Sequence, residues 1–191
     1  SKDLKEKQKL LDDMKNNRKS YPEVLTKARA ALEQKLSAVY GRTIKVWIFA
    51  DLFDVEDEEW KNAVEGRLGR LKLSLITEPK VAADAAKAFR EMGQFEEIDL
   101  IHSEAVTKSN PRAEEGSLYE AVRAVEPFAD SCLKRYLGRI MKCRTVEELR
   151  SAKDGVTPDC YSYSNFIFRH LKKRDYTVGA CIGSKGSRAR Q

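Results

Sequence analysis

The chain has 191 residues, of which 41% are hydrophobic and 35% are charged, and its formal net charge is +6. This length allows one globular domain or two small ones with a sizeable core, and the composition is not that of a disordered chain. No apolar stretch reaches the roughly 20 residues that span a bilayer, and no secretory leader is visible. The chain starts without Met and stops without a cap, so we expect it to be a fragment of a longer protein.

Two helices are predicted at the start of the chain. Residues 2–19 have the pattern of a polar helix, with apolar residues at the spacing of a coiled-coil seam. Because so polar a helix is marginal alone, we expect it to pack against a partner helix that this chain lacks. A second helix is predicted from Pro22, which suits a first turn, to about Tyr40, where Gly41 ends it.

Strands and helices then alternate through residues 43–168, which predicts a mixed α/β body. The predicted strands are residues 43–49, 71–77, 98–101 and 139–144 and the two around the turn in residues 156–163. The predicted helices are residues 57–68, 79–93, 127–137 and 146–152, each behind a cap or a proline. Residues 103–117 are expected to form a mobile loop, and residues 118–125 fit either a strand or a helix.

One tripeptide pattern repeats within the body. Leu68-Gly69-Arg70 recurs 69 residues later as Leu137-Gly138-Arg139, each time after a helix and before a strand and a second helix. A glycine at the end of a helix allows the left-handed turn that leads directly into a strand. We interpret the pattern as an internal repeat, the alternative being a coincidental corner of helix, glycine and strand.

Charge is distributed unevenly along the chain. Residues 41–130 carry 12 basic and 19 acidic groups, a net −7, whereas residues 131–191 carry 14 basic and 5 acidic groups, a net +9. A cationic surplus of this kind is typical of a surface that binds a polyanion such as DNA. The alternative is a solvated basic surface, or one that complements the acidic half.

The sequence predicts no catalysis, no cofactor and no metal site in this fragment. The cysteines are scattered without a zinc-ligand spacing, at Cys132, Cys143, Cys160 and Cys181. Residues 179–185 lack the spacing of a phosphate-binding loop, and the acidic run at residues 56–59 falls in the first turn of a predicted helix. Nothing orients His170 as a base for a Cys160 nucleophile. A small α/β enzyme would instead need a pocket with perturbed acids or thiols.

A second alternative comes from a short glycine motif. Gly183-Ser-Lys-Gly186 is similar to the GXXG loop of KH domains, which clamps single-stranded nucleic acid. This reading would make the chain a stand-alone nucleic-acid-binding α/β module and a monomer. The competing interpretation is a connector that leads out of the body.

Two stretches of sequence together resemble a known family. Residues 51–69, Asp-Leu-Phe-Asp-Val through Gly-Arg-Leu-Gly, resemble the first half of the hinge domain of SMC (structural maintenance of chromosomes) proteins. Residues 136–149, with the Gly-Val-Thr-Pro-Asp-Cys-Tyr run at 155–161, resemble its second half. The resemblance covers residues 43–168, implies an SMC-hinge-like body of two subdomains, and accounts for the repeat.

A finer resemblance points to one group of SMC proteins. Tyr21-Pro22, the run Glu58–Gly66 and the strand end Ile76–Pro79 are similar to the hinge of MukB-like SMC ATPases, above all the JetC subunit of the Wadjet plasmid-defence system and its MksB-type relatives. The chain departs from ordinary SMC hinges at residues 164–174, where Ser-Asn-Phe-Ile-Phe-Arg-His-Leu-Lys-Lys-Arg replaces a glycine-rich dimer segment. The geometry of the dimer is therefore left open.

The resemblance implies a domain organisation and a cellular setting. Residues 1–20 would end one coiled-coil arm, residues 21–116 and 117–186 would be the two hinge subdomains, and residues 187–191 would begin the returning arm. The parent protein would be an ATPase through head domains beyond the arms, organising DNA in the bacterial cytoplasm, at the nucleoid or on plasmids. Its partners would be a second copy, DNA and other subunits of an SMC complex, with no membrane.

Three sets of residues are the predicted sites. The hinge turns are assigned to Gly69 and Gly138. The dimer interface is assigned to exposed strand residues, Leu71, Leu73, Leu75, Tyr163, Phe166 and Phe168; the alternative is ordinary core, which is equally favoured for the first three. Sequence-independent contacts to DNA phosphates are assigned to the basic groups Lys134, Arg135, Arg139, Lys142, Arg144, Arg169, Lys172, Lys173 and Arg174, with Arg67, Arg70 and Lys72 at the equivalent corner of the first repeat.

Overall fold

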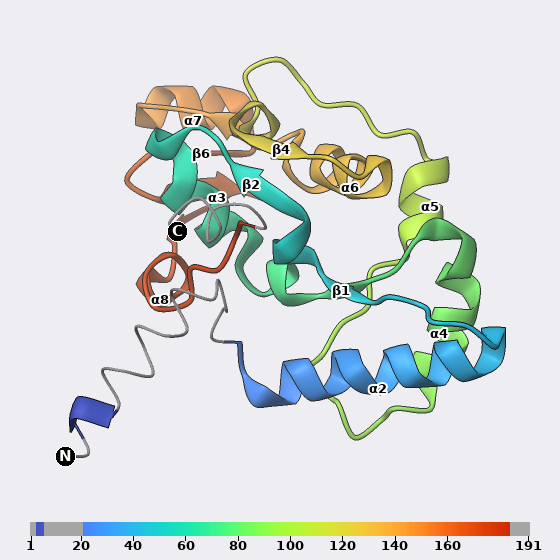
Figure 1. Ribbon diagram of the computed structural model, residues 1–191. Helices are drawn as coiled ribbons and strands as arrows, with labels where there is room; N and C mark the ends of the chain where they lie inside the picture. The colour runs from blue at the N-terminus through green and yellow to red at the C-terminus, as the bar shows by residue number, and fades with distance from the viewer. Residues whose placement is uncertain (1–2, 6–20, 184–191) are drawn as a thin grey trace.

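The computed structural model describes residues 3–5 and 21–183 (Figure 1). Residues 3–5 are helical, and the rest of the predicted arm helix over residues 2–19 lies outside the described residues. In residues 3–5 and 21–183, no helix is long and apolar enough to cross a membrane.

The first long helix, α2 (Glu23–Tyr40), begins and ends where the sequence predicts. Pro22 precedes it, and Gly41 ends it in the left-handed conformation, with φ 65°. One face of the helix, Leu25, Ala28, Leu32 and Leu36, is fully buried. Helix α2 lies along one side of the body beneath β1 and α4 (Figure 1).

The first half of the body contains shorter strands than expected. Its elements are β1 (Trp47–Ile48), η1 (Phe49–Leu52), β2 (Phe53–Val55), η2 (Glu58–Trp60), α3 (Lys61–Leu68), η3 (Gly69–Leu73), β3 (Leu75–Ile76), η4 (Pro79–Val81) and α4 (Ala82–Arg90). The strand predicted over residues 71–77 is wrong in its first half, because residues 69–73 form a 3-10 turn. That turn places Lys72 in the interior. The alternation of polar and apolar residues over 71–77 therefore does not indicate a strand with one exposed and one buried face.

The second half follows the predictions more closely. Its elements are α5 (Ser103–Lys108), η5 (Leu118–Ala121), β4 (Val122–Ala124), α6 (Pro127–Leu137), β5 (Met141–Lys142), α7 (Val146–Ala152), β6 (Gly155–Val156), β7 (Tyr161–Ser164), β8 (Ile167–His170) and α8 (Lys173–Tyr176). The predicted mobile loop over residues 103–117 is a helix in its first part, since α5 packs against α6 with Val106 against the core. Residues 118–125 are neither one helix nor one strand, but a 3-10 turn followed by β4.

Three small sheets hold the body together. Strand β1 pairs antiparallel with β3, and β2 pairs antiparallel with β4. The third sheet has the order β5-β6-β7-β8, with β5 and β6 parallel and the other neighbours antiparallel. One continuous core joins these elements, and ring contacts such as Phe49 with Tyr136 and Trp47 with Phe128 cross it.

The internal repeat is confirmed in the structure. We call residues 43–101 the first lobe and residues 117–170 the second lobe. Turn η5 and strand β4 lie 69 residues after η1 and β2, and α3 and α6 both end at the leucine of the repeated tripeptide. In each lobe the chain then forms a strand, a helix and a segment that pairs parallel with that strand. In the first lobe these are β3, α4 and the bridge at Leu100, and in the second they are β5, α7 and β6.

The two lobes are related by a local two-fold axis. Strands β2 and β4 pair antiparallel, and Asp54 of β2 lies opposite Arg123 of β4. Arg123 is also the residue that corresponds to Asp54 in the repeat, 69 positions later. The flanking pairs, Phe53 with Ala124 and Val55 with Val122, exchange under the same shift. The axis therefore passes through the Asp54–Arg123 pair, and the lobes meet there as equivalent units.

Candidate functional site

The two glycines of the repeated tripeptide have different conformations. Gly69 has φ 49° and ψ −125°, so its φ is positive as the sequence predicts, but its ψ differs from that of the left-handed helical turn. Gly138 has φ −72°, so the predicted left-handed turn is wrong there. Glycine is required at 138 for space instead, since a Cβ atom would clash with the Lys134 carbonyl oxygen and lie 2.9 Å from the Ala113 Cα.

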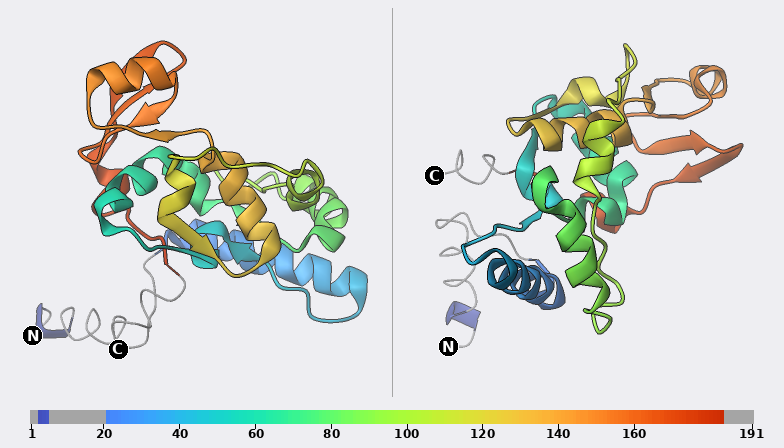
Figure 2. Two further views of the ribbon diagram at one scale, coloured as in Figure 1. Left: turned by 90° about the horizontal axis from the view of Figure 1, so that it is seen from above. Right: turned by 90° about the vertical axis from the view of Figure 1, so that its right-hand side faces the viewer.

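A hairpin of β7 and β8 projects from the second lobe (Figure 2). Its two-residue turn, Asn165-Phe166, has positive φ at both positions, 49° and 63°. Such turns favour Asn followed by Gly, and a phenylalanine in the second position is strained. The Phe166 side chain is 90% exposed, and no contact within the described chain offsets that strain.

Aromatic rings cover one face of this hairpin. Cross-strand register places Tyr163 opposite Phe168 and Tyr161 opposite His170. The Phe168 ring lies 4.4 Å from the Tyr163 ring and 5.7 Å from the Tyr161 ring, centroid to centroid. Every residue of β8 is exposed, and within residues 21–183 no strand pairs with its outer edge. The hairpin thus presents both an unpaired edge and apolar side chains.

The leucines predicted for the same interface lie elsewhere. Leu75 is fully buried in β3, and Leu71 and Leu73 pack against the core from the η3 turn. For Leu75, the alternative of ordinary core is therefore the one that the structure bears out. The exposed members of the predicted dimer set lie on the β7–β8 hairpin.

Several of the predicted DNA-binding residues are engaged with acidic side chains. Lys134 Nζ is 3.3 Å from Asp130, and Lys142 Nζ is 2.9 Å from Glu120. Arg144 donates two hydrogen bonds of 2.9 Å to the Glu59 carboxylate, which lowers the pKa of that carboxyl below its usual value. These three cations thus neutralise neighbouring acids.

The other basic residues of the predicted DNA surface are exposed. Among the described residues none of them has an acidic partner within ion-pair distance, and they are Arg135, Arg139, Arg169, Lys172, Lys173 and Arg174. Four of them lie on β8 and at the start of α8, next to the aromatic hairpin. At the first-lobe corner, by contrast, all three cations are paired: Arg67 with Asp154, Arg70 with Asp99 and Lys72 with Glu65.

The two ends of the described body lie next to each other. The Tyr21 hydroxyl donates a 2.7 Å hydrogen bond to the Asp51 carboxylate, and the Gly183 amide donates a 3.1 Å bond to the Ala50 carbonyl oxygen. Burial, followed by the charge of Asp51, raises the pKa of Tyr21, so its hydroxyl stays protonated and donates. The body over residues 21–183 therefore begins and ends beside neighbouring residues of the first lobe.

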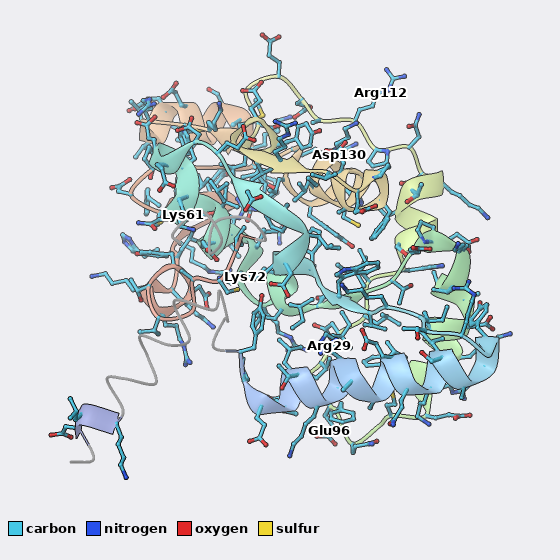
Figure 3. The ribbon with its side chains drawn as sticks, in the orientation of Figure 1. Arg29, Lys61, Lys72, Glu96, Arg112 and Asp130 are labelled. Carbon is cyan, nitrogen blue, oxygen red and sulfur yellow. The ribbon has the colours of Figure 1, made fainter. Side chains whose placement is uncertain are left out.

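A buried ion pair that sequence reasoning missed supports this junction. Glu65 is fully buried in α3, and its carboxylate lies 2.9 Å from Lys72 Nζ and 3.2 Å from Lys61 Nζ. Figure 3 labels both lysines on the side of the body where α3 and α8 lie. The same carboxylate accepts hydrogen bonds from the backbone amides of Cys181 and Ile182. The one sequence feature that indicated this ion pair was the position of Glu65, which is flanked by buried positions of a predicted helix.

The features considered for catalysis have structural partners. Burial raises the pKa of the Cys160 thiol, whose side-chain partner is Tyr176 rather than His170. His170 instead lies against the Tyr161 ring, and Asp57 in the acidic run caps the η2 turn. Over residues 3–5 and 21–183, no three His, Cys, Asp or Glu side chains gather as a metal site would require. Of the glycine motif at 183–186, only Gly183 is described.

Comparison with known proteins gives a fold. No family model and no curated protein matches the chain. Among solved structures, it is similar to the SMC hinge domain of Geobacillus stearothermophilus, crystallised as an asymmetric dimer, with a TM-score of 0.62, 12% identity, and coverage of 99% of this chain and 79% of that one. The SMC hinge domain of Pyrococcus furiosus matches with a TM-score of 0.53 and 16% identity, over 78% of this chain and 90% of that one. A structure of the folded elbow of cohesin matches with a TM-score of 0.58 and 15% identity, over 95% of this chain and 28% of that one. The chain thus has the SMC hinge fold, and the predicted mixed α/β, two-part architecture is confirmed.

Proposed function

We propose that this chain is the hinge of an SMC-like protein and joins two copies of that protein through the β7–β8 hairpin. The observation that carries the proposal is the strained, 90% exposed Phe166 at the tip of an unpaired edge strand. A bulky residue in the left-handed region costs about 1–3 kcal/mol, and the ring is left largely exposed among the described residues. A partner that buries this ring would offset that cost.

The hairpin has the composition of an interface centre. Aromatic side chains dominate the central, fully buried parts of protein interfaces. Ile167 and Phe168 are 48% and 40% exposed beside Phe166, and Phe168 is preorganised by its contacts with Tyr161 and Tyr163. The outer edge of β8 can accept a strand of a second copy, as exposed edges readily do. A two-fold pair would satisfy both edges reciprocally.

The junction at Ala50 and Asp51 supports the hinge role. Two helical arms that belong to one rod must leave the body at one point, and Tyr21 and Gly183 are held at adjacent residues. The predicted arm residues, 1–20 and 187–191, would continue from there. The role of the chain is then mechanical, and any ATPase activity of the parent protein would belong to domains beyond the arms.

Sedimentation velocity across protein concentration tests the pairing. We expect the chain to form a dimer, and Phe166→Ser with Ile167→Lys to weaken dimerisation at least about tenfold, since central aromatic anchors contribute most of an interface's binding energy. The matched control is Val125→Ser, which removes a 68% exposed apolar side chain elsewhere in the second lobe and should leave the dimer intact. A chain that stays monomeric at every concentration contradicts the proposal and favours the stand-alone module.

Non-specific DNA binding is a second proposed function, and the unpaired cations support it. Arg169, Lys172, Lys173 and Arg174 lie together without acidic partners among the described residues, so they are available to phosphates. Each neutralised phosphate releases counterions and steepens the dependence of affinity on salt. We expect micromolar-scale affinity, on the order of 10⁻⁶ M, with no sequence preference.

Charge-neutralising variants separate this function from general electrostatics. Replacing Lys172, Lys173 and Arg174 by Gln should weaken binding to duplex DNA and reduce the salt slope by about two to three units. Lys142→Gln and Arg144→Gln are the matched controls, because those cations are held by Glu120 and Glu59 and should matter little. Fluorescence anisotropy at several salt concentrations gives both quantities. Unchanged binding by the triple variant would remove DNA from the proposal.

The parent protein we propose is a MukB-like SMC ATPase of the Wadjet JetC or MksB type, acting on plasmid or chromosomal DNA in the bacterial cytoplasm. The sequence similarities at Tyr21-Pro22, residues 58–66 and residues 76–79 support this assignment. The full-length sequence tests it directly. Long heptad arms followed by ATPase heads on both sides of the hinge are the expected result, and flanking segments without them contradict it.

A further inference from the structure

The segment that returns the chain from the hairpin to the first lobe is attached mainly through polar contacts. We call residues 171–183 the strap. It leaves β8, crosses helix α3 of the first lobe and ends beside Ala50. Ile182 is its one fully buried apolar side chain, whereas Val178 is almost fully exposed. Leu171 and Cys181 are partly buried against the core, so the strap buries less apolar surface than the elements of the body.

Two buried charges supply most of the strap's anchors. The Glu65 carboxylate accepts bonds from the Cys181 and Ile182 amides, and the Lys72 ammonium donates to the carbonyl oxygen of Asp175. Both side chains are almost fully buried and are joined by a 2.9 Å contact. A buried charge that loses its partners is strongly destabilised, so the strap and the ion pair depend on each other.

Helix α3 is shaped to receive the strap. A Cβ atom on Gly66 would lie 2.8 Å from Leu171 Cδ1 and 3.4 Å from Tyr176 Cδ1, so glycine allows the strap to lie directly on the helix. Helix α8 of the strap packs on α3, yet every residue from 171 to 181 is at least partly exposed. Segments with few buried apolar contacts open locally at a lower free energy than the core.

We propose that the strap is a detachable clasp, which opens as a unit from a body that stays folded. When it is docked on Glu65 and Lys72, Gly183 is held beside the Tyr21–Asp51 contact, and the two ends of the body lie together. When it is released, the C-terminal end moves away while Tyr21 stays in place. This inference does not depend on dimerisation, because every residue in it belongs to one copy.

Native-state hydrogen exchange of the unmodified chain is the first test. The amides of Cys181, Ile182 and Gly183 donate the bonds that hold the strap. We expect these three amides to exchange together, with a lower opening free energy and a weaker denaturant dependence than core amides such as Leu75. If they exchange only with the core, by global unfolding, the strap is not separable and the proposal is wrong.

The strap also carries its own chemical reporter. Cys181 is only partly buried, whereas Cys132, Cys143 and Cys160 are buried in the body. A maleimide should therefore react at Cys181 before the other thiols, an increase in that rate should report strap opening, and Cys181→Ser should remove the reactive thiol. Sedimentation of each variant shows whether its oligomeric state has changed, so a failure of the clasp is distinguishable from a failure of pairing.

Substitution of the anchor should accelerate this reaction. We expect Glu65→Gln to raise the labelling rate of Cys181 at least about tenfold, because Lys72 is then left without its carboxylate. Ile182→Ala should act in the same direction without disturbing the buried charges. Glu78→Gln, which breaks only the exposed Glu78–Lys80 pair, is the matched control and should leave the rate unchanged. A labelling rate that neither Glu65→Gln nor Ile182→Ala alters overturns the proposal.

Discussion

At the residue scale, one sequence pattern is used for two physical purposes. Gly69 is needed for a backbone angle, and Gly138 is needed for close contact with a neighbouring segment. The repeat therefore preserves the residue while its reason changes. The difference arises because the segment at Ala113 packs over the second corner, where the Glu114 amide also bonds to the Gly138 carbonyl oxygen.

Substitution of Gly138 measures that close contact. Gly138→Ala should destabilise the chain by about 1–3 kcal/mol, as overpacking typically does, because the new methyl group meets the Lys134 carbonyl oxygen and the Ala113 backbone. The measurement is urea unfolding followed by circular dichroism. Gly93→Ala is the matched control, since nothing lies within 4 Å of its Cβ position. Equal stability of the two variants would contradict the packing explanation.

At the element scale, predictability depended on whether a local signal decided the outcome. Helix α6 begins at Pro127 and ends at Leu137 as predicted. Helix α7 follows Thr145, whose side-chain oxygen accepts a bond from the Glu148 amide as an N-cap. Proline, cap and glycine signals act within a few residues, so the sequence alone was enough to locate these helices.

Elements decided by distant contacts were not predictable in the same way. Residues 71–73 alternate like a strand, but they belong to η3, in which the buried Lys72 contacts Glu65 and the Asp175 carbonyl oxygen. Helix α5 was missed because it is stabilised by packing on α6 rather than by its own six residues. The β7–β8 turn was missed because phenylalanine is an unusual choice at position 166.

The candidate site shows the same contrast between features decided by local sequence and features decided by distant contacts. Phe166, Phe168 and the cations at 169–174 are exposed, and the roles assigned to them from the sequence stay predictions. The pairing of Lys142 and Arg144 with first-lobe and second-lobe acids was not visible, because Glu59 lies 85 residues from Arg144. For these two residues the structure supports the alternative that basic groups complement the acidic half.

At the scale of the whole molecule, ion pairs across the lobes reinforce the shared core. Arg144 of the second lobe binds Glu59 of the first, and Arg67 of the first lobe lies 2.8 Å from Asp154 of the second. Arg144 also lies over the Trp60 ring. The two lobes are therefore held by charge as well as by apolar contacts, and part of that attachment depends on ionised carboxylates.

This attachment should weaken in acid. Because the pKa of Glu59 is lowered in the folded chain, its contribution to stability is full above the unfolded-state pKa and is lost as the pH falls through the folded-state pKa. We expect the unmodified chain to have a higher Tm than Glu59→Gln at neutral pH, with the difference vanishing in acid. Thermal unfolding across pH measures it, with the exposed Glu97→Gln as control. A difference independent of pH would show that Glu59 acts without its charge.

The side-by-side position of Tyr21 and Gly183 also has a topological consequence. A unit whose chain arrives and departs at adjacent residues can replace a tight turn in a host protein without stretching the host's backbone. Residues 21–183 could therefore be inserted as a unit between two antiparallel helices whose ends lie equally close together.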